Sequence, residues 1–334
     1  MKYKIGIVGG AGFIGTSLAR HFVKNFQVNI LDVKTPPKDL KEAANYCYCD
    51  IRNYKEVMKG LNDVDLVIHT AIVQIPLINE QKKLGYEVNV IGTQNVCRAV
   101  EENPKIKGMI LAGSWHTIGE RELKEVINEE FGFRPDKVES RARLYAFSKI
   151  AQEAIMRFYD EMSNKIFGII RMGTVLGEEM PAETAADMFL EKGLKGEPIT
   201  PFRHSMYRPM LYVDIEDVCR AYEVYASKIL DGKCEKSGNS LAHIVNVYYP
   251  KPITILHLAE IVKSAIIECT HGKITPRIEI VDKGLPILFE ENDVEKMRVD
   301  ISKARNFLGV KKLKSPQESI HRIVRTRFDK THTY

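Results

Sequence analysis

Short apolar runs alternate with stretches of helical periodicity through the first half of the chain. The first run covers residues 5–8, and apolar side chains at Leu18, Ala19 and Phe22 then recur at the spacing of a helix face. Further apolar runs predict strands over residues 28–32, before Asp50, and over 64–71, 108–114 and 243–248. This alternation is typical of an α/β fold, here a Rossmann-type doubly wound parallel sheet.

The remaining segments divide the predicted fold. Residues 89–96 and 144–159 have helical periodicity, whereas residues 115–143 are polar and irregular. We predict a Rossmann domain made of residues 1–177 and about 209–250. Residues 178–208 and 251–334 are predicted to form a smaller, discontinuous substrate-binding lobe over the carboxyl ends of the strands, where such sheets bind ligands.

Three glycines at every-third spacing, Gly9, Gly12 and Gly15, separate the first strand from the helix that follows. The free N–H groups at a helix start and the positive end of the helix dipole form an anion site. Gly9 would permit the turn, Gly12 the approach of a pyrophosphate, and Gly15 the close packing of helix on strand. The predicted dinucleotide contacts here are Gly9, Gly12, Phe13, Ile14 and Gly15; a glycine-rich turn without a ligand is the alternative.

A carboxylate at the end of the second predicted strand indicates which dinucleotide is bound. Asp32 follows the glycine turn at about the distance, roughly twenty residues, at which dinucleotide sites place an acid on the adenine ribose. Such a carboxylate accepts hydrogen bonds from a diol and repels a 2′-phosphate, which favours NAD over NADP. Asp50 and Ile51, after the third predicted strand, suit the adenine edge, although an ordinary strand-to-helix turn has the same pattern.

Ser114, Tyr145 and Lys149 are the candidate catalytic residues. Ser114 ends an apolar strand, and Tyr145 and Lys149 lie four residues apart on one face of a predicted helix. A phenol with a pKa near 10 is a poor base at neutral pH, but a neighbouring ammonium and a cationic nicotinamide favour its phenolate. Tyr145 would then take a proton from a substrate hydroxyl as hydride leaves the same carbon for NAD. Lys149 would lower the tyrosine's pKa and hold the nicotinamide ribose, and Ser114 would hydrogen-bond the reacting oxygen.

These features together resemble the extended short-chain dehydrogenase/reductases, the NAD-dependent epimerase/dehydratase family. The resemblance runs nearly end to end and rests on Gly9-Gly10-Ala11-Gly12-Phe13-Ile14-Gly15, Asp50-Ile51-Arg52, His69-Thr70-Ala71, Asn89-Val90-Ile91-Gly92-Thr93, Tyr145 with Lys149, Arg171-Met172-Gly173-Thr174-Val175-Leu176-Gly177, Arg208-Pro209-Met210-Leu211-Tyr212-Val213-Asp214 and Asp300-Ile301-Ser302-Lys303-Ala304. It implies cofactor contacts at Ala71 and Met172 and a phosphate contact at Arg208. It also implies a homodimer, in which the helix of Tyr145 and the helix over residues 89–100 form a four-helix bundle with those of a second subunit.

Departures from the family pattern reduce the number of reactions that the chain can be expected to catalyse. Dehydratases of this family usually carry Thr-Asp-Glu where this chain has Ser114-Trp115-His116, so a 4,6-dehydration would lack its proton donors. Residues 114–119 and 171–174 are similar to uronate dehydrogenases, which oxidise free sugar acids. Trp115 would either stack on a sugar face or fill the core, and His116 would either donate to a substrate oxygen or make a structural hydrogen bond. The predicted substrate contacts are Ser114, Trp115, His116, Thr174 and Arg208.

Charge, hydropathy and cysteine spacing argue against a nucleic-acid-binding, membrane-spanning, secreted or metal-binding protein. The net charge of +5 is mild, and the densest basic run, residues 311–314, indicates a solvated surface rather than a nucleic-acid footprint. No apolar run is long enough to span a membrane, and the chain leads straight into the first strand, leaving no room for a signal peptide. Six cysteines without C-x-x-C spacing predict reduced thiols in a cytoplasmic protein and no metal site.

The sequence thus predicts an NAD-dependent enzyme that oxidises a sugar hydroxyl by hydride transfer. Epimerisation of a nucleotide sugar, on the pattern of UDP-sugar 4-epimerases, ranks first. Net oxidation of a sugar or uronate is the close alternative. A catalytically silent NAD-binding regulator is the third, and Ser114, Tyr145 and Lys149 argue against it because a sensor needs no base.

Overall fold

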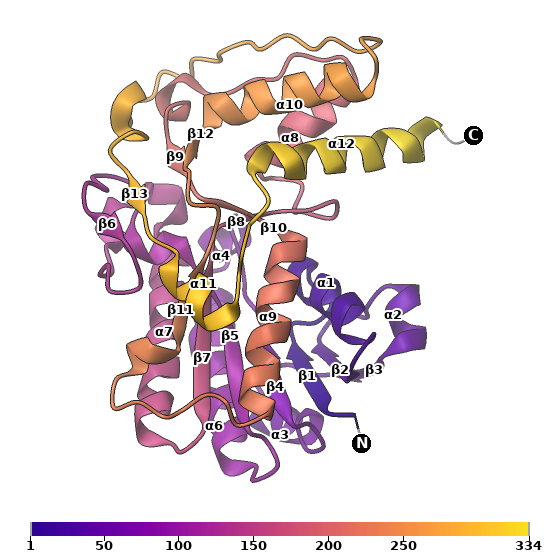
Figure 1. The fold of residues 1–334 in the computed structure, drawn as a ribbon, viewed down its shortest axis with the longest axis vertical. Helices are drawn as coiled ribbons and strands as arrows, with labels where there is room; N and C mark the ends of the chain where they lie inside the picture. Colours follow the sequence, from indigo (N-terminus) through magenta and orange to yellow (C-terminus); the bar gives the residue numbers. More distant parts are fainter. Residues whose placement is uncertain (1, 333–334) are drawn as a thin grey trace.

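A seven-stranded parallel sheet forms the centre of the computed structural model, which describes residues 2–332 (Figure 1). The strand order is β11-β7-β5-β4-β1-β2-β3. The strands are β1 (Lys4–Val8), β2 (Gln27–Asp32), β3 (Asn45–Tyr48), β4 (Leu66–His69), β5 (Gly108–Ser114), β7 (Ile166–Met172) and β11 (Ile244–Val247). This order confirms the predicted doubly wound fold. The strand order reverses between β1 and β4, because β2 and β3 extend the sheet on one side of β1 and β4 begins the other side. Ligands of such sheets bind at that switch point.

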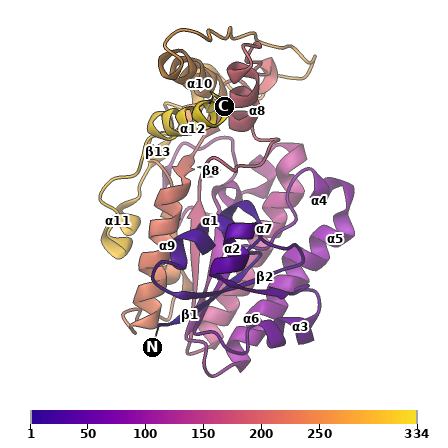
Figure 2. The same cartoon turned by 90° about the vertical axis from the view of Figure 1, so that its right-hand side faces the viewer.

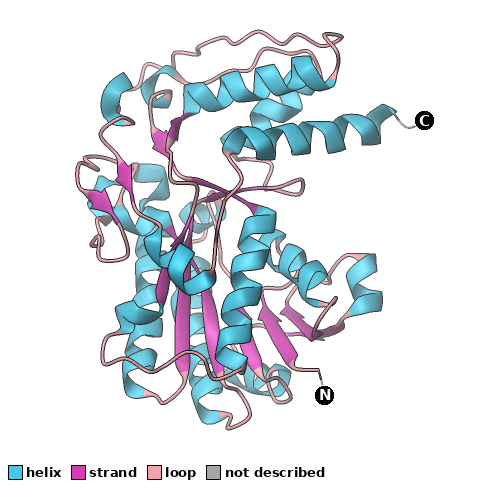
Figure 3. Cartoon of the chain, viewed as in Figure 1, coloured by secondary structure: helices cyan, strands magenta, loops and turns pink. Residues whose placement is uncertain are grey.

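Helices cover both faces of the sheet (Figures 1 and 3). One layer contains α1 (Phe13–Phe22), α2 (Lys38–Ala43) and α9 (Ile215–Leu230); the other contains α3 (Tyr54–Gly60), α6 (Thr93–Glu102) and α7 (Arg143–Met162). Every residue of β5 and β7 is buried, as expected for strands covered on both sides. The two layers therefore leave only the ends of the central strands open to ligands.

A second group of helices stands above the carboxyl ends of the strands (Figure 2). It consists of α8 (Ala185–Leu194), α10 (Ile255–Cys269) and α12 (Pro316–His332), which pack on one another. A short antiparallel pair, β9 (Pro209–Met210) with β12 (Ile253–Thr254), lies below α10. Within the range predicted for the lobe, α11 (Ser302–Leu308) instead packs against β11 and α9. The rest of the predicted domain division stays a prediction.

Two local features differ from the sequence expectations. The predicted irregular segment 115–143 contains β6 (Val126–Ile127), which pairs with β13 (Arg298–Val299) far along the chain. A two-residue strand has no readable period, so the sequence could not indicate it. The strand predicted over residues 64–71 ends at His69, because the N–H groups of Thr70 and Ala71 both turn to Val8 O, at 2.8 and 3.1 Å.

The helix predicted around Asn89 begins as a π-helical segment, Glu87–Gly92, before α6. The Asn89 side chain accepts from Val73 N at 2.7 Å and donates to Val73 O at 3.0 Å and to Ser148 Oγ at 3.0 Å. These bonds tie the loop after β4 to α7. Single π turns inside helices are frequent at functional sites.

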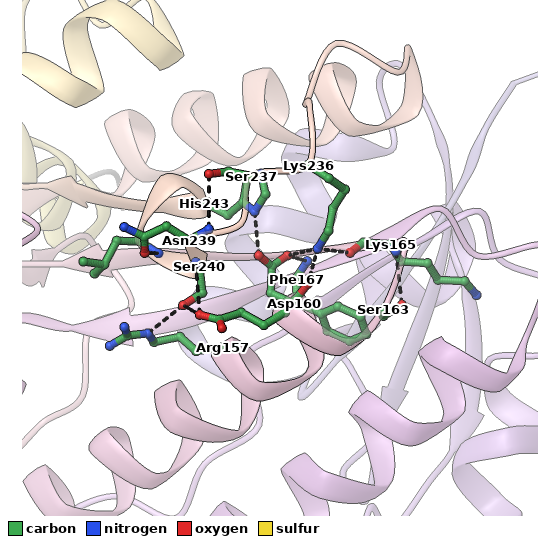
Figure 4. Close-up of polar contacts among 12 residues, drawn as sticks. Arg157, Asp160, Ser163, Lys165, Phe167, Lys236, Ser237, Asn239, Ser240 and His243 are labelled. Atoms are coloured by element: carbon green, nitrogen blue, oxygen red, sulfur yellow. Dashed lines mark hydrogen bonds and ion pairs between the residues drawn. The ribbon is translucent and has the colours of Figure 1, made fainter.

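A buried charge network closes the amino ends of β7 and β11 (Figure 4). The Asp160 carboxylate accepts from Phe167 N at 2.9 Å, from His243 Nδ1 at 2.7 Å and from Lys236 Nζ at 3.0 Å. Asp160 is fully buried near the end of α7. The network therefore joins α7, β7 and the loop before β11 at the end of the sheet opposite the glycine turn.

No helix within residues 2–332 is both long enough and apolar enough to cross a membrane.

Candidate active site

The glycine turn has the geometry that the sequence predicts for it. Gly9 has a φ of +79°, and a Cβ there would lie 2.3 Å from Ala71 N. A Cβ at Gly15 would lie 2.3 Å from Gly9 O, whereas the nearest atom to one at Gly12 is Gly9 O at 3.5 Å. Close backbone packing therefore excludes side chains at Gly9 and Gly15. Gly12 is exposed and uncrowded, so a ligand can approach its backbone. Helix α1 begins at Phe13 with no side-chain cap among the described residues, so its first N–H groups face the turn.

Asp32 ends β2 beside this turn. Its Oδ2 accepts from Ala11 N and its Oδ1 from Lys34 N, both at 2.9 Å. These two bonds fix the carboxylate against the glycine turn, where lone pairs remain for a ribose diol. The predicted adenine-edge residues lie one strand further on. Asp50 is held by Arg52, whose side chain and backbone N–H donate to it, and Ile51 is buried against Gly92.

Ser114, Tyr145 and Lys149 come together at the carboxyl end of β5. Ser114 is the last residue of that strand and pairs in register with Met172 at the end of β7. Tyr145 lies in the first turn of α7, where the Ser114 side chain acts on its hydroxyl to lower the phenol's pKa. Lys149 is buried one turn later, with Nζ donating to Ala112 O at 2.7 Å and lying 5.9 Å from the centre of the Tyr145 ring. The fold thus assembles the three predicted catalytic groups from two elements.

Burial controls the charges of these groups. It raises the pKa of Tyr145 to about 12, against the opposing effect of the Ser114 side chain. It lowers the pKa of Lys149 to about 7. In this structure the Lys149 ammonium is turned to Ala112 O, and desolvation of the phenolate dominates the pKa of Tyr145. The lowering of that pKa by Lys149 together with a bound nicotinamide stays a prediction.

Trp115 lies beside the site but not in it. Its indole is 1% exposed, and Nε1 donates to Thr174 Oγ1 at 3.3 Å. Of the two interpretations of this residue, the geometry favours core filling over stacking on a sugar. Thr174 is partly buried, and its hydroxyl oxygen accepts this hydrogen bond from the indole.

His116 lies between the catalytic serine and a buried carboxylate. Its Nδ1 is 3.3 Å from Ser114 Oγ, and its Nε2 is 3.4 Å from Glu120 Oε1. The imidazole also meets the Tyr145 ring edge to face, with centroids 5.8 Å apart. Because an ionised carboxylate only accepts, Glu120 favours the tautomer with a proton on Nε2, and Nδ1 then faces the serine hydroxyl as an acceptor.

Arg208, predicted to contact a phosphate, is held by two carboxylates. Its Nη1 lies 3.0 Å from Glu139 Oε1 and 3.8 Å from Glu120 Oε1. Arg208 is 7%, Glu120 1% and Glu139 9% exposed. Burial opposes ionisation of Glu120, but the neighbouring His116 imidazole and the charge of Arg208 lower its pKa to about 2.

Sequence reasoning missed Glu120, Glu139 and Asn89 as residues that shape the site. One signal was available: Glu120 follows His116 by four residues. The sequence contains no such signal for Glu139, because only the fold brings its partner Arg208 close to it.

A sequence model of the NAD dependent epimerase/dehydratase family matches residues 5–239. The chain belongs to this family. The match confirms the predicted resemblance, the enzyme class and the dependence on NAD, and the glycine turn and Asp32 fit that cofactor. The open approach at Gly12 suits a pyrophosphate, and the fixed carboxylate suits a ribose diol.

Named relatives and a solved structure resemble the chain along most of its length. A Methanocaldococcus jannaschii protein named "Putative UDP-glucose 4-epimerase" is 28% identical over 329 residues, covering 95% of this chain and 96% of that protein. D-erythronate dehydrogenase of Haemophilus influenzae is 26% identical over 206 residues, covering 59% of this chain and 62% of the enzyme. The crystal structure of Thermotoga maritima UDP-glucose 4-epimerase with UDP-glucose has a TM-score of 0.77 at 20% identity and covers 98% of this chain and 99% of that one. This structural likeness extends the agreement in fold to the whole chain.

Proposed function

We propose that this family member oxidises a hydroxyl-bearing carbon of a sugar by hydride transfer to NAD. The observation that carries the proposal is the convergence of Ser114, Tyr145 and Lys149 at the carboxyl end of β5, on the sheet edge that also carries the glycine turn. A group that can take a proton, a group that can orient an oxygen and a buried cation are what such an oxidation needs.

In this proposal Tyr145 accepts the hydroxyl proton and Ser114 holds the reacting oxygen by a hydrogen bond. The cofactor, when bound, supplies the hydride acceptor. Lys149, which loses part of its charge through burial, holds the ribose next to the nicotinamide and is the group best placed to stabilise the Tyr145 phenolate. The proton and the hydride leave the same alcohol, which becomes a ketone, so charge and electrons balance.

The first form of the reaction is epimerisation of a nucleotide sugar, in which the hydride returns to the opposite face of the carbon. The similarity to the Methanocaldococcus protein over nearly the full length supports this form.

The second form is net oxidation of a sugar or uronate. The pairing of Arg208 with Glu139 and Glu120 favours it, because an arginine held by carboxylates has less charge to offer a diphosphate. Partial similarity to D-erythronate dehydrogenase supports the same form.

Following NADH absorbance together with product stereochemistry separates the two forms. Enzyme, NAD and candidate sugars are incubated, and both quantities are recorded over many turnovers. Steady accumulation of NADH with an oxidised product rules out epimerisation as the main activity. An inverted sugar without net NADH rules out net oxidation, since an epimerase returns the hydride it took.

The proposed substrate contacts are His116 and Arg208, in addition to Ser114. His116 presents one nitrogen to Ser114 and is part of the same hydrogen-bonded group. Trp115 and Thr174 are assigned a supporting role, because their mutual hydrogen bond fixes the segment after β5.

We also propose the predicted homodimer. Helix α7 exposes Phe147, Phe158 and Met162 to solvent, with Phe158 65% exposed, while Ala151 and Ile155 on the same helix are half-buried. Large apolar side chains exposed on one helix are typical of a helix–helix interface. Phe158→Glu should yield a monomer by light scattering at micromolar concentration, whereas Ile280→Glu, at an exposed apolar residue far from α7, should not. A wild-type monomer would refute the dimer.

We propose a cytoplasmic location, because all six cysteines are free thiols, as expected in a reducing compartment.

A further inference from the structure

The charge of Arg208 is compensated inside the protein. One guanidinium faces two carboxylates, Glu120 and Glu139, and all three side chains are more than nine-tenths buried. Arg141 also pairs with Glu139, at 2.8 Å, but it does so from solvent, with its side chain 56% exposed. The buried part of this cluster, defined as Glu120, Glu139 and Arg208, therefore carries one more negative than positive charge.

The cluster belongs to the proposed active site. His116 connects it to the catalytic serine through two contacts, 3.3 Å to Ser114 Oγ and 3.4 Å to Glu120 Oε1. The cluster is therefore separated from the catalytic serine by a single side chain, His116.

Several buried polar atoms of the cluster have no hydrogen-bond partner within residues 2–332: Nε and Nη1 of Arg208, Oε1 of Glu120 and Oε1 of Glu139. The 3.0 Å approach of Arg208 Nη1 to Glu139 Oε1 is an ion pair without hydrogen-bond angles. Donors and acceptors thus remain side by side. Buried polar groups are nearly always paired, so these atoms mark a place where a further polar group fits.

The mixture of free donors and acceptors selects the kind of group. A sugar hydroxyl both donates and accepts, so it can bond a carboxylate oxygen and a guanidinium N–H together. A phosphate or a carboxylate only accepts, and it would bring further negative charge beside two buried carboxylates. We propose that Glu120 and Glu139 make this site specific for an uncharged, hydroxyl-bearing sugar and exclude a diphosphate or carboxylate next to Arg208. The inference rests on the proposed oxidation by hydride transfer, and within it favours an uncharged sugar over the nucleotide sugar of the first form and the uronate of the second.

Binding of three probes to the NAD-loaded enzyme tests this proposal. Calorimetry with UDP, D-glucuronate and a panel of uncharged aldoses compares a diphosphate, a carboxylate and hydroxyl groups alone. We expect no heat from UDP or D-glucuronate at millimolar concentration and binding of at least one uncharged aldose. A micromolar dissociation constant for UDP or D-glucuronate in the wild type would overturn the proposal.

A charge-removing variant provides the second measurement. In the double variant Glu120→Gln, Glu139→Gln, Arg208 loses its anionic partners, and we expect the affinity for UDP to rise at least tenfold above that of the wild type. Glu122→Gln, which changes an exposed carboxylate in the same segment, is the matched control and should leave UDP binding unchanged. Unchanged UDP affinity in a folded, NAD-binding double variant would contradict the proposal. If that variant does not fold, the wild-type measurement decides alone.

The failure of this inference can be told apart from failure of the proposed function. Tyr145-dependent turnover of a nucleotide sugar or a uronate would contradict the specificity assigned to Glu120 and Glu139 while supporting hydride transfer. Absence of Tyr145-dependent turnover with every uncharged, acidic and nucleotide-linked sugar would contradict the proposed function itself.

Discussion

Two buried charge clusters lie at opposite ends of the sheet, and they differ in how completely their atoms are bonded. At the amino ends of β7 and β11, the carboxylate of Asp160 is bonded through both oxygens, and His243 also directs Nε2 to Glu235 O at 3.0 Å (Figure 4). At the carboxyl ends, the cluster of Glu120, Glu139 and Arg208 holds together by ion pairs and leaves donors and acceptors unbonded.

The difference separates a structural role from a functional one. A fully bonded buried network stabilises the fold, because each charge has regained the partners it lost with water. An incompletely bonded network reduces stability and keeps the capacity to bind another polar group. Sites that depart from full satisfaction are where function is expected. The comparison therefore predicts that changes at the carboxyl ends alter activity, and changes at the amino ends alter stability.

The largest expected effect is on catalysis. Tyr145→Phe should lower kcat on the true substrate by roughly two to four orders of magnitude, the scale for loss of a positioned acid/base, and leave NAD binding largely intact. Tyr159→Phe on the same helix removes a hydroxyl that accepts from Gln94 and should leave kcat unchanged. Near-normal turnover by Tyr145→Phe would mean that another group is the base.

The next effect is on stability at the opposite end. Asp160→Asn leaves Lys236 and His243 without their buried carboxylate and should lower the free energy of unfolding by about 3 kcal/mol, measured by denaturant titration. Its kcat should stay within about twofold of the wild type at a temperature where both are folded. Asp231→Asn, in an exposed pair with Lys233, is the control and should change stability by less than about 0.5 kcal/mol. A loss of activity without a loss of stability would reverse the roles assigned to the two ends.

A smaller effect follows from the buried cation of the active site. Because burial lowers the pKa of Lys149 to about 7, the folded site gives up a proton that the unfolded chain keeps up to about pH 10.4. The unfolded state binds more protons in this window, so the free energy of unfolding should rise with pH between about 7 and 10. Relative to Lys149→Met, the wild-type protein without NAD should gain on the order of 2 kcal/mol from pH 7 to pH 9.

The control for this pH dependence is Lys233→Met, at an exposed lysine, which should follow the wild-type curve. Parallel curves for the wild type and Lys149→Met would show that Lys149 keeps its ordinary pKa in the folded protein.

The smallest effect concerns the cofactor. Asp32 should make NAD bind at least tenfold more tightly than NADP, a difference of about 1.4 kcal/mol, because a 2′-phosphate would meet its carboxylate. In Asp32→Ala the two affinities should approach each other, whereas Asp39→Ala, on the outer helix α2, should preserve the ratio. Equal affinities of the wild type for NAD and NADP, measured by calorimetry, would refute the role assigned to Asp32 in cofactor choice.

Structural features that leave a short-range spacing pattern in the sequence were predictable. Apolar alternation indicated the strands, the glycine spacing indicated the turn, and the four-residue spacing placed Tyr145 and Lys149 on one face of α7. The pairing of β6 with β13 and the π-helical start before α6 were not predictable, because neither leaves a period in the sequence. The rise in the pKa of Tyr145 through burial was not predictable either, since burial is a property of the packed molecule.

The sequence by itself thus determined the family, the parallel sheet, the NAD-binding turn and the identity of three candidate catalytic residues, because each depends on residues close together in the chain. Only the tertiary structure decided that Trp115 fills the core and that Arg208 is held by Glu120 and Glu139. Those contacts join the segment after β5 to the residues before β9, and their distances depend on how the elements pack. Charge compensation between such distant segments is set by burial and proximity, which one-dimensional spacing does not contain.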